Sequence, residues 1–216
     1  MYWKKEFIDF CCKKQVLKFG QFTLKSGRTS PYFFNSGLLS NGEDIVKIGV
    51  FYAHSIMNSN VDFDILFGTA YKGIPVAVST SIALKNHYNL NIPYTFNRKE
   101  KKTYGEQGKL IGNIIENKKI IILDDVITSG TAIHNSIKIV EEHKAYISSI
   151  FVLFDRKEKG ERELHTINCL EKKKNYKITS IITIEDLIDY LLENKTLKRH
   201  LIKLLKYRKK YGIDKQ

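Results

Sequence analysis

The chain has 216 residues, of which 43% are hydrophobic and 27% charged, and its formal net charge is +13. This composition excludes a chain that is disordered throughout, and no apolar run approaches the roughly 18 residues that a membrane span needs. Three cysteines, two of them adjacent at Cys11 and Cys12, make a poor disulfide framework and favour a cytoplasmic location. We therefore expect one globular domain over residues 1–216.

Strands alternate with helices along most of the chain. The segment 119–124 is the clearest strand, because an apolar run of β-branched residues is typical of a parallel sheet that is buried on both faces. Two short β-like segments on either side of Gly27 predict a hairpin. In chain order the expected elements are a helix over 6–17, strands 22–25 and 32–35, a helix over 41–57, strand 64–67, a helix over 73–85, strands 94–97 and 119–124, a helix over 130–143, strands 146–154 and 178–183, and a helix over 185–205 interrupted near Asn194. This alternation predicts an α/β fold with a central, mostly parallel sheet flanked by helices.

The positive charge is concentrated in two segments. Residues 195–216 carry nine Lys and Arg residues against one acid, Asp214, and residues 98–109 carry five against two glutamates. A net positive charge of this size first suggests a polyanionic partner such as nucleic acid. For the tail 195–216, the sequence does not choose between a solvated helix face, a product of biased codon usage and a weak contact with a polyanion. As a helix, the tail is expected to pack four leucines inward: Leu197, Leu201, Leu204 and Leu205.

The most informative segment runs from Ile121 to Ala132. A buried strand delivers two carboxylates, Asp124 and Asp125, to its carboxyl end, where doubly wound sheets bind their ligands. A loop rich in Thr, Ser and Gly then opens a helix, and loops of this kind cradle phosphate through hydroxyls and N-terminal amides. Because paired carboxylates suit Mg²⁺ or sugar hydroxyls, the segment matches a phosphorylated sugar.

Two other interpretations of this segment compete with a site for a phosphorylated sugar. If only the two acids are considered, the favoured interpretation has no binding role. They would be an acidic pair at the end of a strand, followed by a Thr or Ser that caps the next helix. A Walker-type nucleotide site also places acids after an apolar run. The chain has no Gly-x-x-x-x-Gly-Lys-Ser/Thr, however, so the partner motif of such a site is missing.

The segment 123–132 resembles the motif that binds 5-phosphoribosyl 1-diphosphate (PRPP) in the type I phosphoribosyltransferase family. Within that family, residues 19–35 are similar to the amino-terminal hairpin of the orotate phosphoribosyltransferases, and residues 70–75 to their diphosphate-contacting loop. Residues 98–106 resemble their catalytic loop, and Asp155-Arg156 their pyrimidine-side segment. The resemblance implies a small hood formed by residues 1–40 with a later segment, and a mobile loop over 98–112.

The implied reaction transfers the 5-phosphoribosyl group of PRPP to orotate, giving orotidine 5′-monophosphate and diphosphate in pyrimidine (UMP) synthesis. Lys102, Asp124 and Asp125 are implied to be catalytic. Lys102 would act as a general acid or a transition-state clamp, and the two carboxylates would contact the ribose hydroxyls and help to place the oxocarbenium charge. The residues implied to bind PRPP are Lys25, Tyr71, Lys72, Arg98, Lys99, Lys102, Tyr104, Asp124, Asp125, Val126, Ile127, Thr128, Ser129, Gly130, Thr131 and Ala132. Those implied to bind orotate are Lys25, Phe33, Phe34, Thr128 and Arg156.

The resemblance also implies Mg²⁺ as cofactor, carried mainly by PRPP and not by a protein metal cage. It implies a homodimer in which the loop 98–112 reaches the neighbouring subunit's site. Two competing hypotheses are a regulator of the same fold that binds RNA or DNA, and a purine phosphoribosyltransferase. The retained catalytic loop, the paired carboxylates and the two phenylalanines disfavour the first, so nucleic acid is not an expected partner, and the hairpin disfavours the second.

Two positions depart from the family pattern. Tyr104 stands where the family usually has His, and Gln107 stands where it usually has Gly. Tyrosine can donate a hydrogen bond to phosphate, but it does not titrate near neutral pH. We therefore expect Tyr104→His to keep the activity or raise it, and we expect Gln107 to stiffen the loop.

Overall fold

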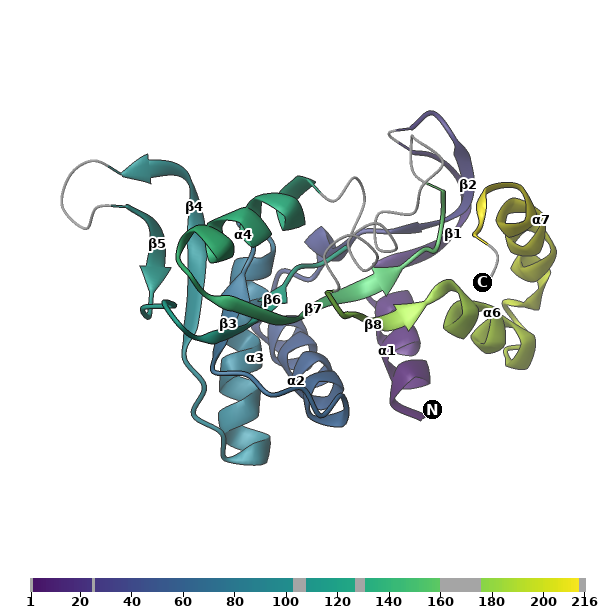
Figure 1. Ribbon diagram of the computed structural model, residues 1–216. Helices are drawn as coiled ribbons and strands as arrows, with labels where there is room; N and C mark the ends of the chain where they lie inside the picture. Colours follow the sequence, from purple (N-terminus) through teal and green to yellow (C-terminus); the bar gives the residue numbers. More distant parts are fainter. Residues whose placement is uncertain (1, 25, 103–107, 127–130, 160–175, 214–216) are drawn as a thin grey trace.

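The computed structural model describes residues 2–24, 26–102, 108–126, 131–159 and 176–213. Helices and strands alternate along the chain, as the sequence predicts (Figure 1). In chain order the elements are α1 (Tyr2–Lys13), β1 (Leu17–Thr23), β2 (Thr29–Phe34), η1 (Ser36–Leu38), α2 (Gly42–Asn58), β3 (Ile65–Gly68), α3 (Gly73–Tyr88), β4 (Tyr94–Lys102), β5 (Gly108–Gly112), β6 (Lys119–Leu123), α4 (Thr131–Glu142), β7 (Tyr146–Asp155), β8 (Ile178–Thr183), α6 (Ile184–Glu193), η2 (Lys198–His200) and α7 (Leu201–Tyr211).

Six strands form the central sheet, in the order β5-β4-β3-β6-β7-β8. The neighbours from β4 to β8 pair in parallel, and β5 runs antiparallel to β4. Strands β1 and β2 form a separate antiparallel hairpin. The predicted α/β fold with a mostly parallel sheet is therefore confirmed.

Side chains of β6 show why the sheet is covered on both faces. Ile121 and Leu123 belong to one buried cluster and Ile120 and Ile122 to another, since successive residues of a strand point to opposite faces. All four are fully buried. Helix α4 covers one face, and α1, α2 and α3 lie on the other (Figure 1). Strand β6 thus lies at the centre of the core, with buried residues on both of its faces.

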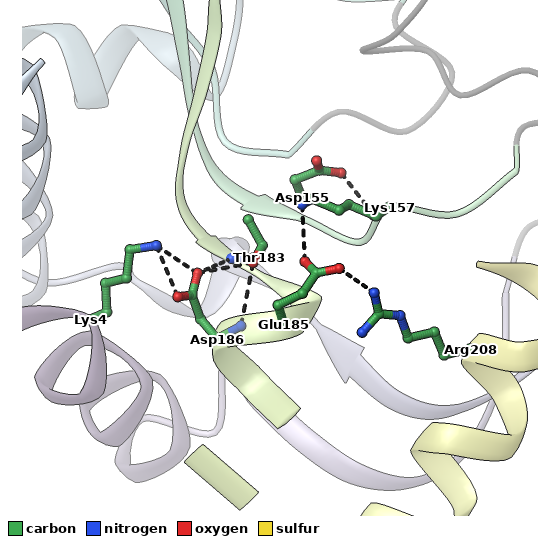
Figure 2. A network of polar contacts seen from close by, with 7 residues as sticks. All are labelled: Lys4, Asp155, Lys157, Thr183, Glu185, Asp186 and Arg208. Carbon is green, nitrogen blue, oxygen red and sulfur yellow. Dashed lines mark hydrogen bonds and ion pairs between the residues drawn. The ribbon is translucent and has the colours of Figure 1, made fainter. Parts of the chain in front are cut away.

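The C-terminal helices are tied to the sheet by polar contacts as well as by packing (Figure 2). Thr183 caps α6 in a reciprocal capping box with Asp186, whose carboxylate also lies 2.8 Å from Lys4 Nζ of α1. Glu185 lies 3.1 Å from Lys157 Nζ and also pairs with Arg208 of α7. These contacts fix α7 relative to the segment that follows β7.

The structure differs from the sequence-based expectation in two places, the segment 98–112 and Leu205. Strand β4 continues to Lys102 and pairs with β5, so much of the segment expected to be a loop over 98–112 is a two-stranded ribbon. The helix expected over 185–205 is interrupted after Asn194, as anticipated. Leu205 is 44% exposed and does not pack inward, whereas Tyr207 is buried. No helix among the described residues is both long and apolar enough to cross a membrane.

Candidate active site

Two loops meet where β3 and β6 end. Gly68 pairs with Leu123 across these parallel strands, so the loop of residues 69–72 begins beside Asp124. Thr69 N donates to the Leu123 carbonyl at 3.1 Å, and the Thr69 and Ser136 hydroxyls lie 3.2 Å apart. The carboxyl edge of the sheet therefore brings the predicted diphosphate loop against the predicted ribose carboxylates.

Glycine permits this close approach. A Cβ atom on Gly73 would lie 2.3 Å from the Leu123 carbonyl oxygen, and one on Gly68 would lie 2.7 Å from the Gly73 carbonyl oxygen. Any larger residue would push the loop away from the end of β6. The two glycines thus set the spacing between the loop and the carboxylates.

Lys72 and Asp125 form an ion pair across these two strand ends. Lys72 Nζ lies 2.8 Å from Asp125 Oδ2 and 3.3 Å from the Ser36 hydroxyl, which itself donates to Asp125. The Asp125 side chain is only 12% exposed, whereas that of Lys72 is 58% exposed. The ammonium group is therefore anchored on one side and open to an incoming anion on the other.

Asp124 is buried beside this pair. Its Oδ1 accepts the Asp125 amide at 2.9 Å, and its backbone carbonyl accepts the Tyr52 hydroxyl at 2.5 Å. Burial, reinforced by the charge of Asp125, raises the pKa of Asp124 to about 7. The two adjacent acids thus lie in different surroundings. Asp125 forms an ion pair with Lys72, whereas Asp124 is poorly solvated.

The segment predicted to bind phosphate lies only partly within the described residues. Val126 bridges to Phe154 of β7, and Thr131 and Ala132 form the start of α4. The predicted contacts of Ile127, Thr128, Ser129 and Gly130 fall outside the described residues. Helix α4 begins at Thr131, six residues after Asp125.

The β4–β5 ribbon approaches the same site from the other side of β3. Lys99 Nζ lies 4.4 Å from the centre of the Tyr71 ring, and Arg98 donates to the Gly108 carbonyl at 3.3 Å. Asn97 Oδ1 accepts the Ala70 amide at 3.0 Å, which ties β4 to the diphosphate loop. The backbone of Lys102 ends β4, whereas Tyr104 and Gln107 lie outside the described residues.

The predicted pyrimidine side is formed by β2 and the end of β7. Phe33 is 37% exposed and stacks on Phe22, whereas Phe34 packs against Phe154 with ring centres 5.3 Å apart. Arg156 forms a buried ion pair at 2.8 Å with Glu158, and its guanidinium lies 4.3 Å from the centre of the Tyr32 ring. Lys25, the remaining predicted residue on this side, is not among the described residues.

Sequence reasoning missed four residues that the structure places at or behind the site: Ser36, Tyr52, Glu158 and Tyr207. Ser36 and Tyr52 lie far from Asp124 and Asp125 in sequence, and no local pattern marks their hydroxyls. For Glu158 and Tyr207, the spacing to a neighbouring residue in the sequence could have indicated their positions. Glu158 lies two residues after Arg156, and Tyr207 follows Leu204 by three residues on the inward face of α7.

Comparison with known proteins agrees with this geometry. Residues 38–187 match the model of the phosphoribosyl transferase domain. The orotate phosphoribosyltransferase of Buchnera aphidicola subsp. Acyrthosiphon pisum (strain Tuc7) is 71% identical over 213 residues, which cover 99% of this chain and all of that protein. That of Pseudoalteromonas translucida (strain TAC 125) is 50% identical over 208 residues, covering 96% and 97% of the two chains. The crystal structure of orotate phosphoribosyltransferase from Francisella tularensis matches with a TM-score of 0.88 at 39% identity, covering 96% of this chain and all of the other. The chain therefore belongs to the orotate phosphoribosyltransferase family.

Proposed function

We propose that this enzyme transfers the 5-phosphoribosyl group of PRPP to orotate, giving orotidine 5′-monophosphate and diphosphate in pyrimidine biosynthesis. The observation that carries the proposal is the arrangement of side chains where β3 and β6 end. There an exposed ammonium group, Lys72, lies beside the Asp124–Asp125 pair. This arrangement offers a cation for a diphosphate and acceptors for ribose hydroxyls within one site.

The reaction requires little covalent chemistry from the protein. The bond from C1 of the ribose to the diphosphate oxygen breaks, and the diphosphate leaves with the electron pair. N1 of orotate bonds to C1, and its proton passes to the released diphosphate or to solvent. The developing positive charge on the ribose is stabilised by carboxylates, and the departing negative charge by cations. We assign the first role to Asp124 and Asp125 and the second to Lys72, Arg98, Lys99 and Lys102.

Orotate is assigned to the end of the hairpin that carries Phe33 and Phe34, with Arg156 after β7 as its hydrogen-bond donor. The exposed face of Phe33 offers a flat surface for a planar ring. Arg156 is held against Glu158, so it presents N–H donors in a fixed direction. Stacking and directed hydrogen bonds together position the reacting nitrogen.

We further propose that Mg²⁺ enters with PRPP. Mg²⁺ typically binds one or two carboxylates together with substrate phosphates, and Asp124 and Asp125 supply carboxylate oxygens at the site. Asp125 is already engaged by Lys72 and Ser36, which favours an ion held mainly by the diphosphate. When bound there, Mg²⁺ would neutralise part of the leaving group's charge.

The assembly is proposed to be a cytoplasmic homodimer, with residues 98–112 reaching the neighbouring subunit's site. The ribbon supports an intermolecular role because β4 and β5 extend beyond the helices that cover the sheet (Figure 1). Lys99 contacts Tyr71 of its own chain, so we restrict the intermolecular role to other residues of the segment. The unpaired thiols of Cys11 and Cys12 fit a reducing compartment.

The activity is tested by mixing the protein with PRPP, Mg²⁺ and orotate and following the loss of orotate absorbance. We expect turnover that chelation of Mg²⁺ with EDTA abolishes and that added Mg²⁺ restores. No turnover with orotate, together with turnover of a purine base or tight binding of RNA, would favour one of the competing hypotheses instead.

Complementation tests the shared site. Lys72→Ala and Lys102→Ala would each inactivate every site of a homodimer in which the two residues come from different chains. Mixing the two variants would assemble heterodimers that have one site with neither substitution, so part of the activity should return. A mixture that stays as inactive as its components would argue that both residues serve the same chain's site.

A further inference from the structure

Both oxygens of the Glu158 carboxylate are held by tyrosine hydroxyls. Oε1 accepts the Tyr32 hydroxyl at 3.0 Å, and Oε2 accepts the Tyr207 hydroxyl at 3.0 Å. The same Oε1 accepts Arg156 Nε at 2.8 Å. A hydroxyl from the C-terminal helix is therefore linked, through one carboxylate, to the guanidinium on the pyrimidine side.

The surroundings leave this group little freedom. The Arg156 and Glu158 side chains are only 15% and 14% exposed. The guanidinium lies over the Tyr32 ring at 4.3 Å, and its Nη2 donates to the Ser30 hydroxyl at 3.0 Å. Contacts to both its face and its edge thus define the orientation of the guanidinium.

The tyrosine hydroxyls stay protonated donors at neutral pH. Burial, reinforced by the Glu158 charge, raises the pKa of Tyr207 to about 12. Burial also raises the pKa of Tyr32 well above its usual value. Each tyrosine therefore donates a hydrogen bond to an ionised acceptor, which is stronger than a bond between neutral groups.

Helix α7 is itself fixed at the place from which Tyr207 projects. Lys159 N donates to the Tyr211 carbonyl at 2.9 Å, and Ile213 N donates to the Lys157 carbonyl at 3.0 Å. Arg208 pairs with Glu185, which also lies 3.1 Å from Lys157 Nζ (Figure 2). The segment that carries Arg156 and Glu158 is thus joined to α7 through backbone and side-chain contacts.

We propose that Tyr207 is a positioning residue for the orotate site, which acts by orienting Glu158 and, through it, Arg156. This inference rests on the proposed function, in which Arg156 contacts orotate. It assigns the C-terminal helix a part in substrate recognition, because Tyr207 of that helix holds Glu158. Glu158 in turn neutralises the guanidinium of Arg156, which then acts mainly as a source of directed N–H donors. A freely rotating arginine would lose conformational freedom on binding orotate, whereas this one is already ordered.

The test is Tyr207→Phe, which removes the hydroxyl and keeps the ring. We expect the KM for orotate to rise about threefold to tenfold, less than for losing a direct charged hydrogen bond, because the hydroxyl acts on orotate only through Glu158 and Arg156. The KM for PRPP and kcat should change by less than about twofold, because Tyr207 touches neither the diphosphate loop nor the ribose carboxylates. Tyr211→Phe, on the same helix, is the matched control and should leave both KM values unchanged. Equal changes in both KM values for Tyr207→Phe would overturn the inference.

A double-mutant cycle separates positioning from general stability. In an Arg156→Lys background, Tyr207→Phe should shift the KM for orotate by less than about twofold, since the group it orients is gone. An undiminished effect in that background would overturn the inference. Tyr32→Phe removes the hydroxyl from the other carboxylate oxygen and should act in the same direction, so it replaces Tyr207→Phe if that variant is unstable. A wild-type protein that does not turn over orotate would contradict the proposed function itself, whereas an active wild type with an unaffected Tyr207→Phe variant would contradict only this inference.

Discussion

Lys72 Nζ lies 2.8 Å from Asp125 Oδ2, although the two residues are 53 positions apart in sequence. Their contact depends on the pairing of β3 with β6, which are adjacent in the sheet although β4 and β5 separate them in the chain. The carboxylate fixes one side of the ammonium group and leaves the other open. In the proposed function, an incoming diphosphate would therefore meet a cation that is already in place.

Replacing Lys72 tests this role. In Lys72→Met, we expect kcat/KM for PRPP to fall about 100-fold or more, the size typical of losing one preorganised group that stabilises developing charge. The KM for orotate should change little. Lys138→Met is a suitable control, because Lys138 is 76% exposed on α4 and pairs only at 3.8 Å with Glu142. Steady-state kinetics measure both variants, and a loss below about threefold for Lys72→Met would remove Lys72 from the site.

Asp124 makes the stability of the fold depend on pH. Burial and the charge of Asp125 raise its pKa from 3.8 to about 7. Because the folded state holds this proton more tightly than the unfolded state, the free energy of unfolding falls as the pH rises from about 4 to about 7. Above that range the destabilisation is complete.

Asp124→Asn should therefore be more stable than the wild type but less active. Asparagine keeps the acceptor for the Asp125 amide and carries no charge. We expect Tm at pH 8 to rise by about 3–8 °C and the gain to shrink as the pH is lowered toward 5. Thermal melts at several pH values measure this, with turnover of orotate assayed in parallel. A gain that is the same at every pH would show that the charge of Asp124 is not its source.

Local patterns predicted the part of the site that lies in one stretch of chain. The apolar run ending at Leu123 predicted a central strand, and the rule that ligands bind at the carboxyl ends of parallel strands then placed Asp124 and Asp125. The break near Asn194 could also be predicted. These features depend on neighbours in sequence, where spacing and residue type carry the information.

Contacts between distant segments could not be predicted in the same way. The local sequence pattern does not determine the order of the strands, so it could not show that Ser36 contacts Asp125. It also could not show that Glu158 contacts Tyr207, although the place of each in its own segment could be predicted. Strand β5 was missed because its five residues, Gly108–Gly112, contain two glycines and a lysine and form a strand only by pairing with β4. The exposure of Leu205 reflects the register of α7, whose inward face is set by Leu204 and Tyr207.

Gly73 tests whether the close approach of the diphosphate loop to β6 is needed. A Cβ at this position would lie 2.3 Å from the Leu123 carbonyl oxygen, so Gly73→Ala must displace the loop that carries Lys72. We expect Tm to fall by about 4–10 °C, from a strain of about 1–3 kcal/mol, and the KM for PRPP to rise. Gly42→Ala is the matched control, because a Cβ there meets nothing within 4 Å and the residue opens α2. Equal melting temperatures for the two variants would mean that the loop adapts to the added methyl group.

Lys102 is the residue that the family resemblance implies as a catalytic group, and its backbone ends β4 beside the start of β5. If it stabilises the departing diphosphate only in the transition state, its removal should affect the chemical step and not ground-state binding. We expect Lys102→Ala to lower kcat about 100-fold or more and to change the Kd for orotate, measured by calorimetry, by less than about threefold. Lys109→Ala, at an exposed position of β5 in the same ribbon, should leave both quantities close to those of the wild type. If kcat and orotate affinity fell by similar factors in Lys102→Ala, the residue would bind substrate without assisting the chemical step.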